Sequence, residues 1–152
     1  MSIKQDQTKR VRVLIADDNK EMRDTVVRLL ENDFEVVAAV GDGRALVDAA
    51  RKLDPDAAIV DISMPILNGI EAVAEIKKHN PKMKAIFLTV NEDADFVRAA
   101  FDVGGLAYVV KRQMATDLHV ALRHALADET FISPGCDFPG APDLKLDRIT
   151  LR

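Results

Sequence analysis

Five polar side chains lie at the ends of apolar runs in this sequence, and together they could bind a metal ion and a phosphate. They comprise three carboxylates, a hydroxyl and an ammonium: Asp17, Asp18, Asp61, Thr89 and Lys111. Two like charges ~4 Å apart cost about 4 kcal/mol at an effective dielectric constant of about 20, so clustered carboxylates favour a cation. Oxygen ligands suit Mg²⁺, while lysine and threonine suit phosphate oxygens. The set predicts a site where a carboxylate accepts a phosphoryl group.

The spacing of these residues predicts that they meet at one edge of a parallel sheet. Asp61 comes 44 residues after Asp17. Thr89 follows 28 residues after Asp61, and Lys111 comes a further 22 residues on. Because one βα unit takes roughly 20–28 residues, these gaps correspond to two units, one unit and one unit. All the polar groups then follow the carboxyl ends of strands, where open α/β sheets bind their ligands.

Short apolar runs alternate with segments of helical periodicity, which predicts five βα units. The predicted strands cover residues 11–16, 35–40, 57–60, 85–88 and 106–110, and the predicted helical segments cover 22–30, 46–53, 70–78, 93–103 and 118–125. Nearly continuous apolar strands are typical of a sheet covered on both faces. We therefore expect a doubly wound α/β domain over residues 10–130, with five parallel strands in the order 2-1-3-4-5. The order reverses between strands 1 and 3, where Asp17, Asp18 and Asp61 would meet.

The fourth helical segment has recognisable end signals. Asn91 is the predicted N-cap, with Glu92 and Asp93 in the first turn, where negative charge is favourable. Gly104 and Gly105 are expected to end this helix.

Composition narrows the classes of function. The 152 residues carry a net charge of −4 with both signs mixed, which disfavours broad nucleic-acid or membrane binding through charge alone. The single cysteine, Cys136, allows no internal disulfide, and a reducing, cytoplasmic location is expected. No apolar run is long enough to suggest a signal peptide or a membrane span. Residues 131–152 are predicted to be a linker or tail, since 133–143 contain three prolines and two glycines.

The chain resembles a response-regulator receiver domain, which has a flavodoxin-like (βα)₅ fold. The matching residues, within about 10–128, are Asp17-Asp18, Asp61 in Asp-Ile-Ser-Met-Pro, Gly69, Thr89, Tyr108 and Lys111. The resemblance implies that Asp61 is the phosphoacceptor and that Lys111 binds the phosphate. It implies a Mg²⁺ site in which Asp18 binds directly, Asp17 binds largely through water, and Ser63 contributes its backbone carbonyl.

The resemblance also implies partners and an output. A histidine kinase or phosphotransfer protein would donate the phosphoryl group, and the domain would be a signalling module instead of an enzyme with its own substrate. Thr89 would move toward the phosphate and Tyr108 would turn inward, which would reshape the face of helix 4, strand 5 and helix 5. A homodimer could form on that change. Tyr108 could alternatively be a core residue without a switching role.

Three positions depart from the common family pattern. Val90 stands where a smaller residue is usual, and its bulk could hinder access to the phosphate. Arg112 follows Lys111 where proline is frequent, so a cis peptide is not expected there. Ala107 replaces a frequent glycine. The Lys-Arg pair resembles the NarL/FixJ-type branch, and residues 149–152 resemble the opening of a LuxR-type helix-turn-helix domain, so DNA binding would require that further domain.

Other functions remain as alternatives. A pseudo-receiver would be a protein-interaction module that works without phosphorylation. A phosphatase of the haloacid-dehalogenase type also uses an aspartate nucleophile but needs Asp-x-Asp after strand 1, where this chain has adjacent Asp17 and Asp18. An FMN-binding flavodoxin would need a phosphate-binding loop at that place, and the acidic sequence there has the wrong charge.

Overall fold

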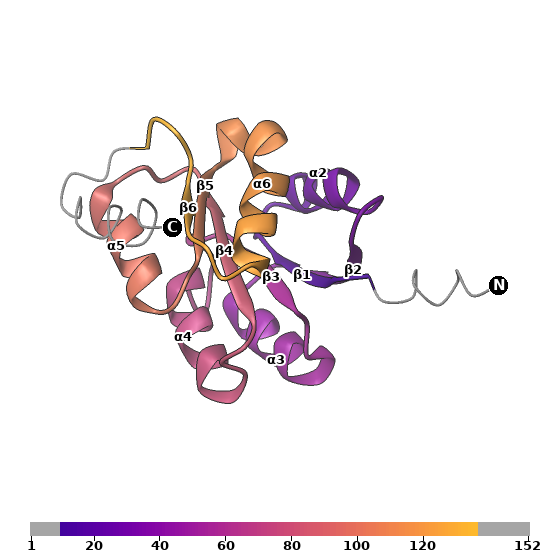
Figure 1. Ribbon diagram of the computed structural model, residues 1–152. Coiled ribbons are helices and arrows are strands. Elements are labelled where there is room, and N and C mark those ends of the chain that lie inside the picture. Colours follow the sequence, from indigo (N-terminus) through magenta and orange to yellow (C-terminus); the bar gives the residue numbers. More distant parts are fainter. Residues whose placement is uncertain (1–9, 137–152) are drawn as a thin grey trace.

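The computed structural model describes residues 10–136, which form a six-stranded parallel sheet between two layers of helices (Figure 1). The strand order is β2-β1-β3-β4-β5-β6, so the predicted order of the first five strands is confirmed. The strands are β1 (Arg12–Ala16), β2 (Glu35–Val40), β3 (Ala57–Val60), β4 (Lys84–Thr89), β5 (Ala107–Val110) and β6 (Phe131–Ile132). Strand β4 is longer than predicted because its first and last residues, Lys84 and Thr89, are polar.

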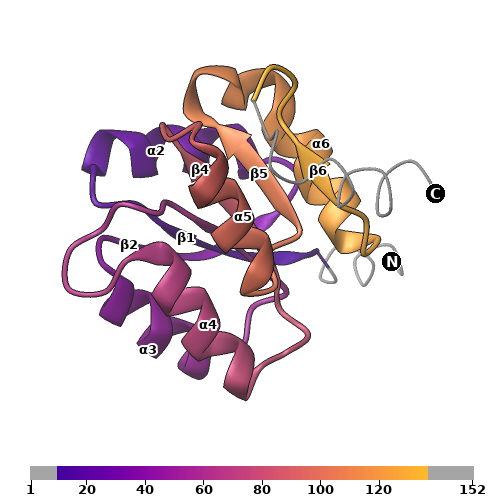
Figure 2. The ribbon, with the colours of Figure 1, turned by 90° about the vertical axis from the view of Figure 1, so that its left-hand side faces the viewer.

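Helices follow the first five strands. They are α2 (Lys20–Leu30), α3 (Gly43–Leu53), α4 (Gly69–His79), α5 (Ala94–Asp102) and α6 (Met114–Leu126), with a short 3₁₀ turn η1 (Lys111–Gln113) before α6. Figure 2 shows α3 and α4 on one side of the sheet and α2 and α6 on the other. No helix in the described part of the chain has the length and apolar character required to span a membrane.

The core consists of two apolar layers, because successive residues of a strand point to opposite faces of the sheet. In β1, Leu14 and Ala16 belong to the layer packed against α3, α4 and α5. Val13 and Ile15 belong to the layer packed against α2 and α6. The central strands are therefore apolar on both faces, and their polar side chains begin only where the strands end.

Helix caps fix the chain where it leaves the carboxyl edge of the sheet. The side chain of Asn19 accepts a hydrogen bond from the backbone N–H of Met22 at the start of α2. At the start of α4, Asn68 and Glu71 form a reciprocal capping box. These caps satisfy backbone donors at the first turns, so the loops that follow β1 and β3 have defined paths.

The predicted cap of α5 was wrong. Asp93 is the N-cap, since its side chain accepts a hydrogen bond from the N–H of Asp95. Asn91 instead faces the end of β4, where its backbone N–H and side-chain amide approach the Thr89 hydroxyl at 3.3 and 3.5 Å. The helix ends near Gly104 as expected, with Gly104 at a φ of 100°.

Strand β6 was not predicted, because two residues carry no periodic signal. Phe131 pairs with Ala107 and Ile132 pairs with Tyr108, so β6 covers the outer edge of β5. Of the next residues, Ser133 and Cys136 are also buried. The larger part of the predicted tail, 137–152, and the short helix-turn-helix resemblance at 149–152 lie outside the described residues.

A substitution at Gly69 tests how closely α4 packs against β3. A β-carbon at this position would lie 2.1 Å from the backbone oxygen of Asp61 and 2.8 Å from Val60 Cγ1. We expect Gly69→Ala to lower the free energy of unfolding by more than about 3 kcal/mol, because backbone cannot move aside cheaply. Urea denaturation measures the change.

Gly41→Ala is the matched control. Its β-carbon would meet the flexible end of Arg23, at 3.0 Å from Nη1, and that side chain can shift. Equal losses of stability in the two variants would contradict the close contact inferred for Gly69.

Candidate functional site

Three acidic residues meet at the carboxyl edge of the sheet, as the spacing predicted. Asp17 and Asp18 follow β1 and Asp61 follows β3, and these strands are neighbours. The Asp61 backbone N–H donates to the Ala16 carbonyl at 2.9 Å, which extends the pairing to the site itself. One carboxylate oxygen from each of the three residues lies within 4.8 Å of the others.

The three carboxylates differ in exposure. Asp17 is 2% exposed and Asp61 is 5% exposed, whereas Asp18 is exposed. Two buried carboxylates and one open to solvent form a site that is reached from one side. A ligand could thus enter beside Asp18 and contact Asp61 at the base.

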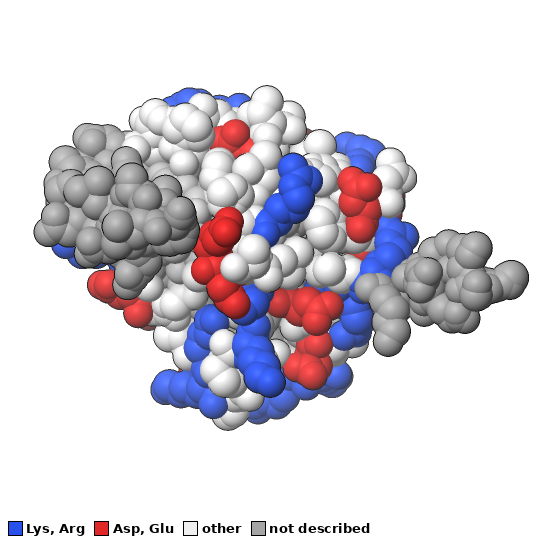
Figure 3. Space-filling view, viewed as in Figure 1, with Lys and Arg blue, Asp and Glu red and all other residues white. Residues whose placement is uncertain are grey.

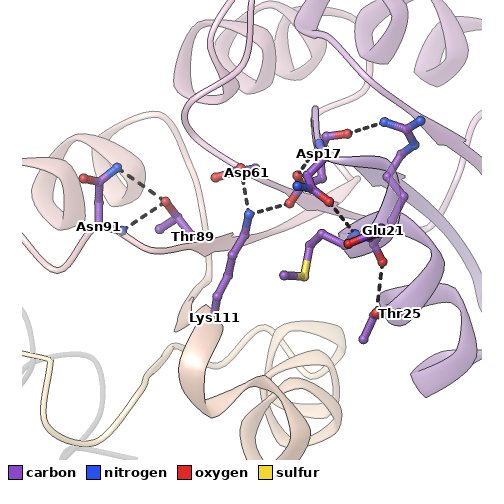
Figure 4. Close-up of polar contacts among 10 residues, drawn as sticks. Asp17, Glu21, Thr25, Asp61, Thr89, Asn91 and Lys111 are labelled. Atoms are coloured by element: carbon purple, nitrogen blue, oxygen red, sulfur yellow. Dashed lines mark hydrogen bonds and ion pairs between the residues drawn. The ribbon is translucent and has the colours of Figure 1, made fainter.

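Lys111 joins the ends of three strands (Figure 4). Its Nζ lies 2.6 Å from Asp17 Oδ2 and 3.0 Å from Asp61 Oδ2. The lysine side chain is mostly buried and comes from η1, directly after β5. One ammonium is thus shared between two carboxylates from separate strands.

The electrostatics of the site follow from burial and from these ion pairs. Burial raises the pKa of Asp61 above its ordinary value, and the hydrogen bond and charge of Lys111 only partly offset this. Burial alone would lower the pKa of Lys111, but its bonds to Asp17 and Asp61 outweigh burial and raise it. Lys111 therefore remains an ammonium and Asp61 is a destabilised carboxylate.

The donor set fits a hard divalent cation. Three carboxylates face one ammonium, so negative charge remains in excess, and all the available side-chain ligand atoms of the cluster are oxygens. Mg²⁺ binds in this way, through a few carboxylates supplemented by water and phosphate oxygens. Ser63 lies exposed two residues after Asp61, and the role of its carbonyl remains a prediction.

Thr89 and Tyr108 lie on adjacent strands, on the side of the site away from Asp17. Thr89 is fully buried at the end of β4, and its hydroxyl faces Asn91. Tyr108 is also fully buried, and its hydroxyl donates to the Asn91 carbonyl at 2.9 Å. Asn91 therefore touches both residues of the predicted switch pair.

Two further contacts were not anticipated from the sequence. Arg112 makes a two-pronged ion pair with Glu92, with N–O distances of 2.8 and 3.0 Å, and so links η1 to the β4–α5 loop. Arg23 of α2 donates from Nη1 to the Asp17 carbonyl at 2.8 Å. The Lys111-Arg112 dipeptide departs from the common family pattern, but neither contact has a sequence signal, since both depend on how loops fold back. Val90 points outward, with 70% exposure.

A doubly wound sheet with an acidic cluster and a lysine at its switch point defines a class of phosphate-handling signalling domains. The family model described as "Response regulator receiver domain" matches residues 13–123, and the chain belongs to this family. The predicted family and fold class are therefore confirmed.

Similar proteins agree with the NarL/FixJ-type branch. The chain is 32% identical over 127 residues to the transcriptional regulatory protein DegU of Brevibacillus brevis, covering 82% of this chain and 54% of that protein. It is 30% identical over 127 residues to the response regulator GacA of Pseudomonas aeruginosa, with 82% and 59% covered. The chain thus spans little more than half the length of these relatives.

Solved structures show the same fold. A two-component response regulator of the LuxR family from Aurantimonas sp. SI85-9A1 superposes with a TM-score of 0.79 at 27% identity, covering 83% of this chain and 91% of that one. The isolated receiver domain of RcsB from Salmonella enterica, with the phosphomimetic BeF₃⁻, gives a TM-score of 0.75 at 30% identity, covering 83% and 95%.

The burial of Asp61 predicts a cost in stability. In the absence of divalent cations at neutral pH, we expect Asp61→Asn to raise the free energy of unfolding, because burial raises the pKa of Asp61 and its ionised form therefore destabilises the fold. Urea denaturation measures this. Asp18→Asn is the control and should change stability less, because Asp18 is exposed. If Asp61→Asn instead lowers the free energy of unfolding, the buried carboxylate does not destabilise the fold.

The ion pair between Glu92 and Arg112 should be sensitive to acid. The hydrogen bond from Arg112 lowers the pKa of Glu92 below its ordinary value of 4.5. The contact is therefore complete above pH 4.5 and is lost as the pH falls through the lowered pKa. The ¹⁵N shift of Arg112 Nε should follow this titration. Glu92→Gln should abolish the transition, and an unchanged titration in that variant would assign it to another group.

Proposed function

We propose that Asp61 accepts a phosphoryl group from the phosphohistidine of a histidine kinase or phosphotransfer protein. The observation that carries this proposal is a buried carboxylate held by Lys111 beside two further acidic residues. A carboxylate oxygen of Asp61 forms a bond to phosphorus as the phosphorus–nitrogen bond breaks, and the electron pair stays on the imidazole, which carries a proton on its other ring nitrogen. The products are an aspartyl phosphate and a neutral histidine.

The other residues of the site have separate roles in this proposal. Asp17, Asp18, Asp61 and the backbone carbonyl of Ser63 would hold Mg²⁺. The bound cation supplies positive charge to the oxygens of the transferring phosphoryl group. Lys111 exchanges its contact with the Asp61 carboxylate for one with a phosphate oxygen, which preserves its charge pairing.

Thr89 and Tyr108 would couple phosphorylation of Asp61 to a conformational change at the protein surface. The Thr89 hydroxyl, which faces Asn91, is expected to move toward the phosphate when one is present. The Asn91 carbonyl also accepts a hydrogen bond from the Tyr108 hydroxyl. Movement of Thr89 would therefore alter the contact that holds the Tyr108 side chain. Tyr108 already points inward in this structure, so phosphorylation would stabilise a conformation that the chain can adopt beforehand. The output face, predicted as the fourth helix, fifth strand and fifth helix, would consist of α5, β5 and α6.

We further propose that this domain regulates transcription as the input module of a longer protein. DegU is a transcriptional regulatory protein by name, and one similar structure contains RcsB dimers bound to DNA. A phosphorylation-dependent homodimer in the cytoplasm, with DNA held by a separate helix-turn-helix domain, is consistent with those relatives. Acidic and basic side chains are interspersed on the face seen in Figure 3, so charge alone gives that face no obvious affinity for DNA.

Phosphoryl transfer can be tested with acetyl phosphate and Mg²⁺, followed by intact mass and by the oligomeric state in solution. The wild type should gain the mass of one phosphoryl group, and removing Mg²⁺ with EDTA should prevent the gain. Asp61→Asn should show no gain because it lacks the acceptor oxygen.

Asp24→Asn is the matched control and should behave as wild type, since Asp24 is an exposed carboxylate on α2 paired with Lys20. Phosphorylation that persists in Asp61→Asn would overturn the proposal. A homodimer of equal strength in all variants, with or without acetyl phosphate, would remove the proposed link between phosphorylation and assembly.

A further inference from the structure

The chain leaves the domain along the strand that carries Tyr108. After α6, residues 131–136, here called the exit segment, return beside β5 in parallel (Figure 2). Phe131 donates its backbone N–H to the Leu106 carbonyl at 3.0 Å, and Ser133 donates to the Tyr108 carbonyl at 2.9 Å. The exit segment is thus bonded to the backbone of Tyr108 itself and to that of Leu106, two residues earlier.

Ser133 fixes the exit segment at three points. Besides its backbone bond to Tyr108, its Oγ accepts from the Val110 N–H at 3.1 Å and donates to Asp117 Oδ2 of α6 at 2.8 Å. The serine is 1% exposed. Val110 immediately precedes Lys111, so a single buried side chain connects the exit segment to the strand that positions both Tyr108 and the phosphate-binding lysine.

The exit segment also contributes a buried residue to the apolar cluster that contains Tyr108. Cys136 is buried in the same apolar cluster as Tyr108, together with Val97 and Ala100 of α5. Burial raises the pKa of Tyr108 above its ordinary value, and the nearby Cys136 adds to this. The hydroxyl end of the ring is bonded to Asn91, and the strand edge beside the ring is occupied by β6. Tyr108 has no exposed surface while the exit segment is in place.

We propose that the exit segment holds Tyr108 inward, and that it is the element through which the phosphorylation site and the following part of the protein affect one another. The proposal extends the function proposed above, on which its second half rests. Cys136 and Tyr108 are buried in one apolar cluster, and Ser133 bonds to the Tyr108 backbone, so release of the exit segment would remove both restraints on the tyrosine. The bound exit segment and the inward tyrosine therefore occur together.

Because the two binding equilibria are linked, the phosphate at Asp61 and the bound exit segment must affect one another with the same sign. If a phosphate at Asp61 favours the inward Tyr108, it also favours the bound exit segment. Conversely, pulling the exit segment away frees Tyr108 and weakens the response to phosphate. A domain attached after residue 152 would act on Asp61 in this way without touching the site.

The composition of the chain allows a direct measurement. Tyr108 is the only tyrosine and there is no tryptophan, so intrinsic tyrosine fluorescence reports this side chain alone. Ser133→Ala removes the hydroxyl bonds to Val110 and Asp117. Thr116→Ala is the matched control, because its hydroxyl also contacts Asp117, at 3.2 Å, but touches neither β5 nor β6. Ser133→Pro additionally removes the backbone donor to Tyr108.

In the full 152-residue chain without phosphomimetic, we expect acrylamide quenching of Tyr108 to be weak in wild type and in Thr116→Ala. Quenching and exchange of the Phe131 amide should increase about three- to tenfold in Ser133→Ala, and further in Ser133→Pro, in line with the loss of one or two hydrogen bonds. With Mg²⁺ and beryllofluoride, the half-saturating beryllofluoride concentration should rise about as much in Ser133→Ala and stay unchanged in Thr116→Ala.

Each result has a separate meaning. If Ser133→Pro exposes the Phe131 amide while Tyr108 stays unquenched, the exit segment does not hold the tyrosine and the inference is wrong. If quenching increases but the beryllofluoride response does not shift, the coupling to Asp61 is wrong. The function proposed for Asp61 fails only if wild type shows no beryllofluoride response that Asp61→Asn abolishes, and the quenching experiment without phosphomimetic does not depend on it.

Discussion

The contact on which the rest of the site depends is the ion pair that Lys111 shares between Asp17 and Asp61. Two carboxylates that burial and mutual repulsion would drive apart are held together because one ammonium lies within 3.0 Å of both. The pair also connects the ends of β1, β3 and β5, which are not all neighbours in the sheet. The geometry of the acceptor is therefore set by three strands together, and a ligand that draws Lys111 away changes the forces on all of them.

In the proposed switch, such a change would pass through the rest of the domain over short distances. Thr89 and Tyr108 lie on β4 and β5, between the ion pair and the outer edge of the sheet, and Asn91 contacts both. Arg112 holds the same loop from the other side through Glu92. A movement of Thr89 would therefore act on a loop restrained at two points, one buried and one exposed to solvent.

Much of the fold and most of the site could be predicted from the sequence. Strands such as 57–60 are apolar on both faces, and Asp17, Asp61 and Lys111 mark where the sheet ends, so periodicity and spacing sufficed. The N-cap of α5 was misassigned because Asn91, Glu92 and Asp93 all suit helix starts, and only the tertiary contact of Asn91 with Tyr108 decides between them. Strand β6 and the contacts of Ser133 and Arg112 were missed because each depends on residues distant in the sequence, and the contact of Arg23 was missed because it depends on the path of the loop after β1.

The loop between β3 and α4 contains a residue in a strained backbone conformation. Ile66 has a φ of 72° in a three-residue turn closed by the Leu67 N–H and the Pro65 carbonyl, and its side chain is 78% exposed. A β-branched residue is disfavoured in this conformation, and nothing in its burial compensates for it. Glycine or asparagine at this position would relieve the strain. Such a substitution should increase stability without changing the acidic cluster, whose nearest member, Asp61, lies five residues earlier.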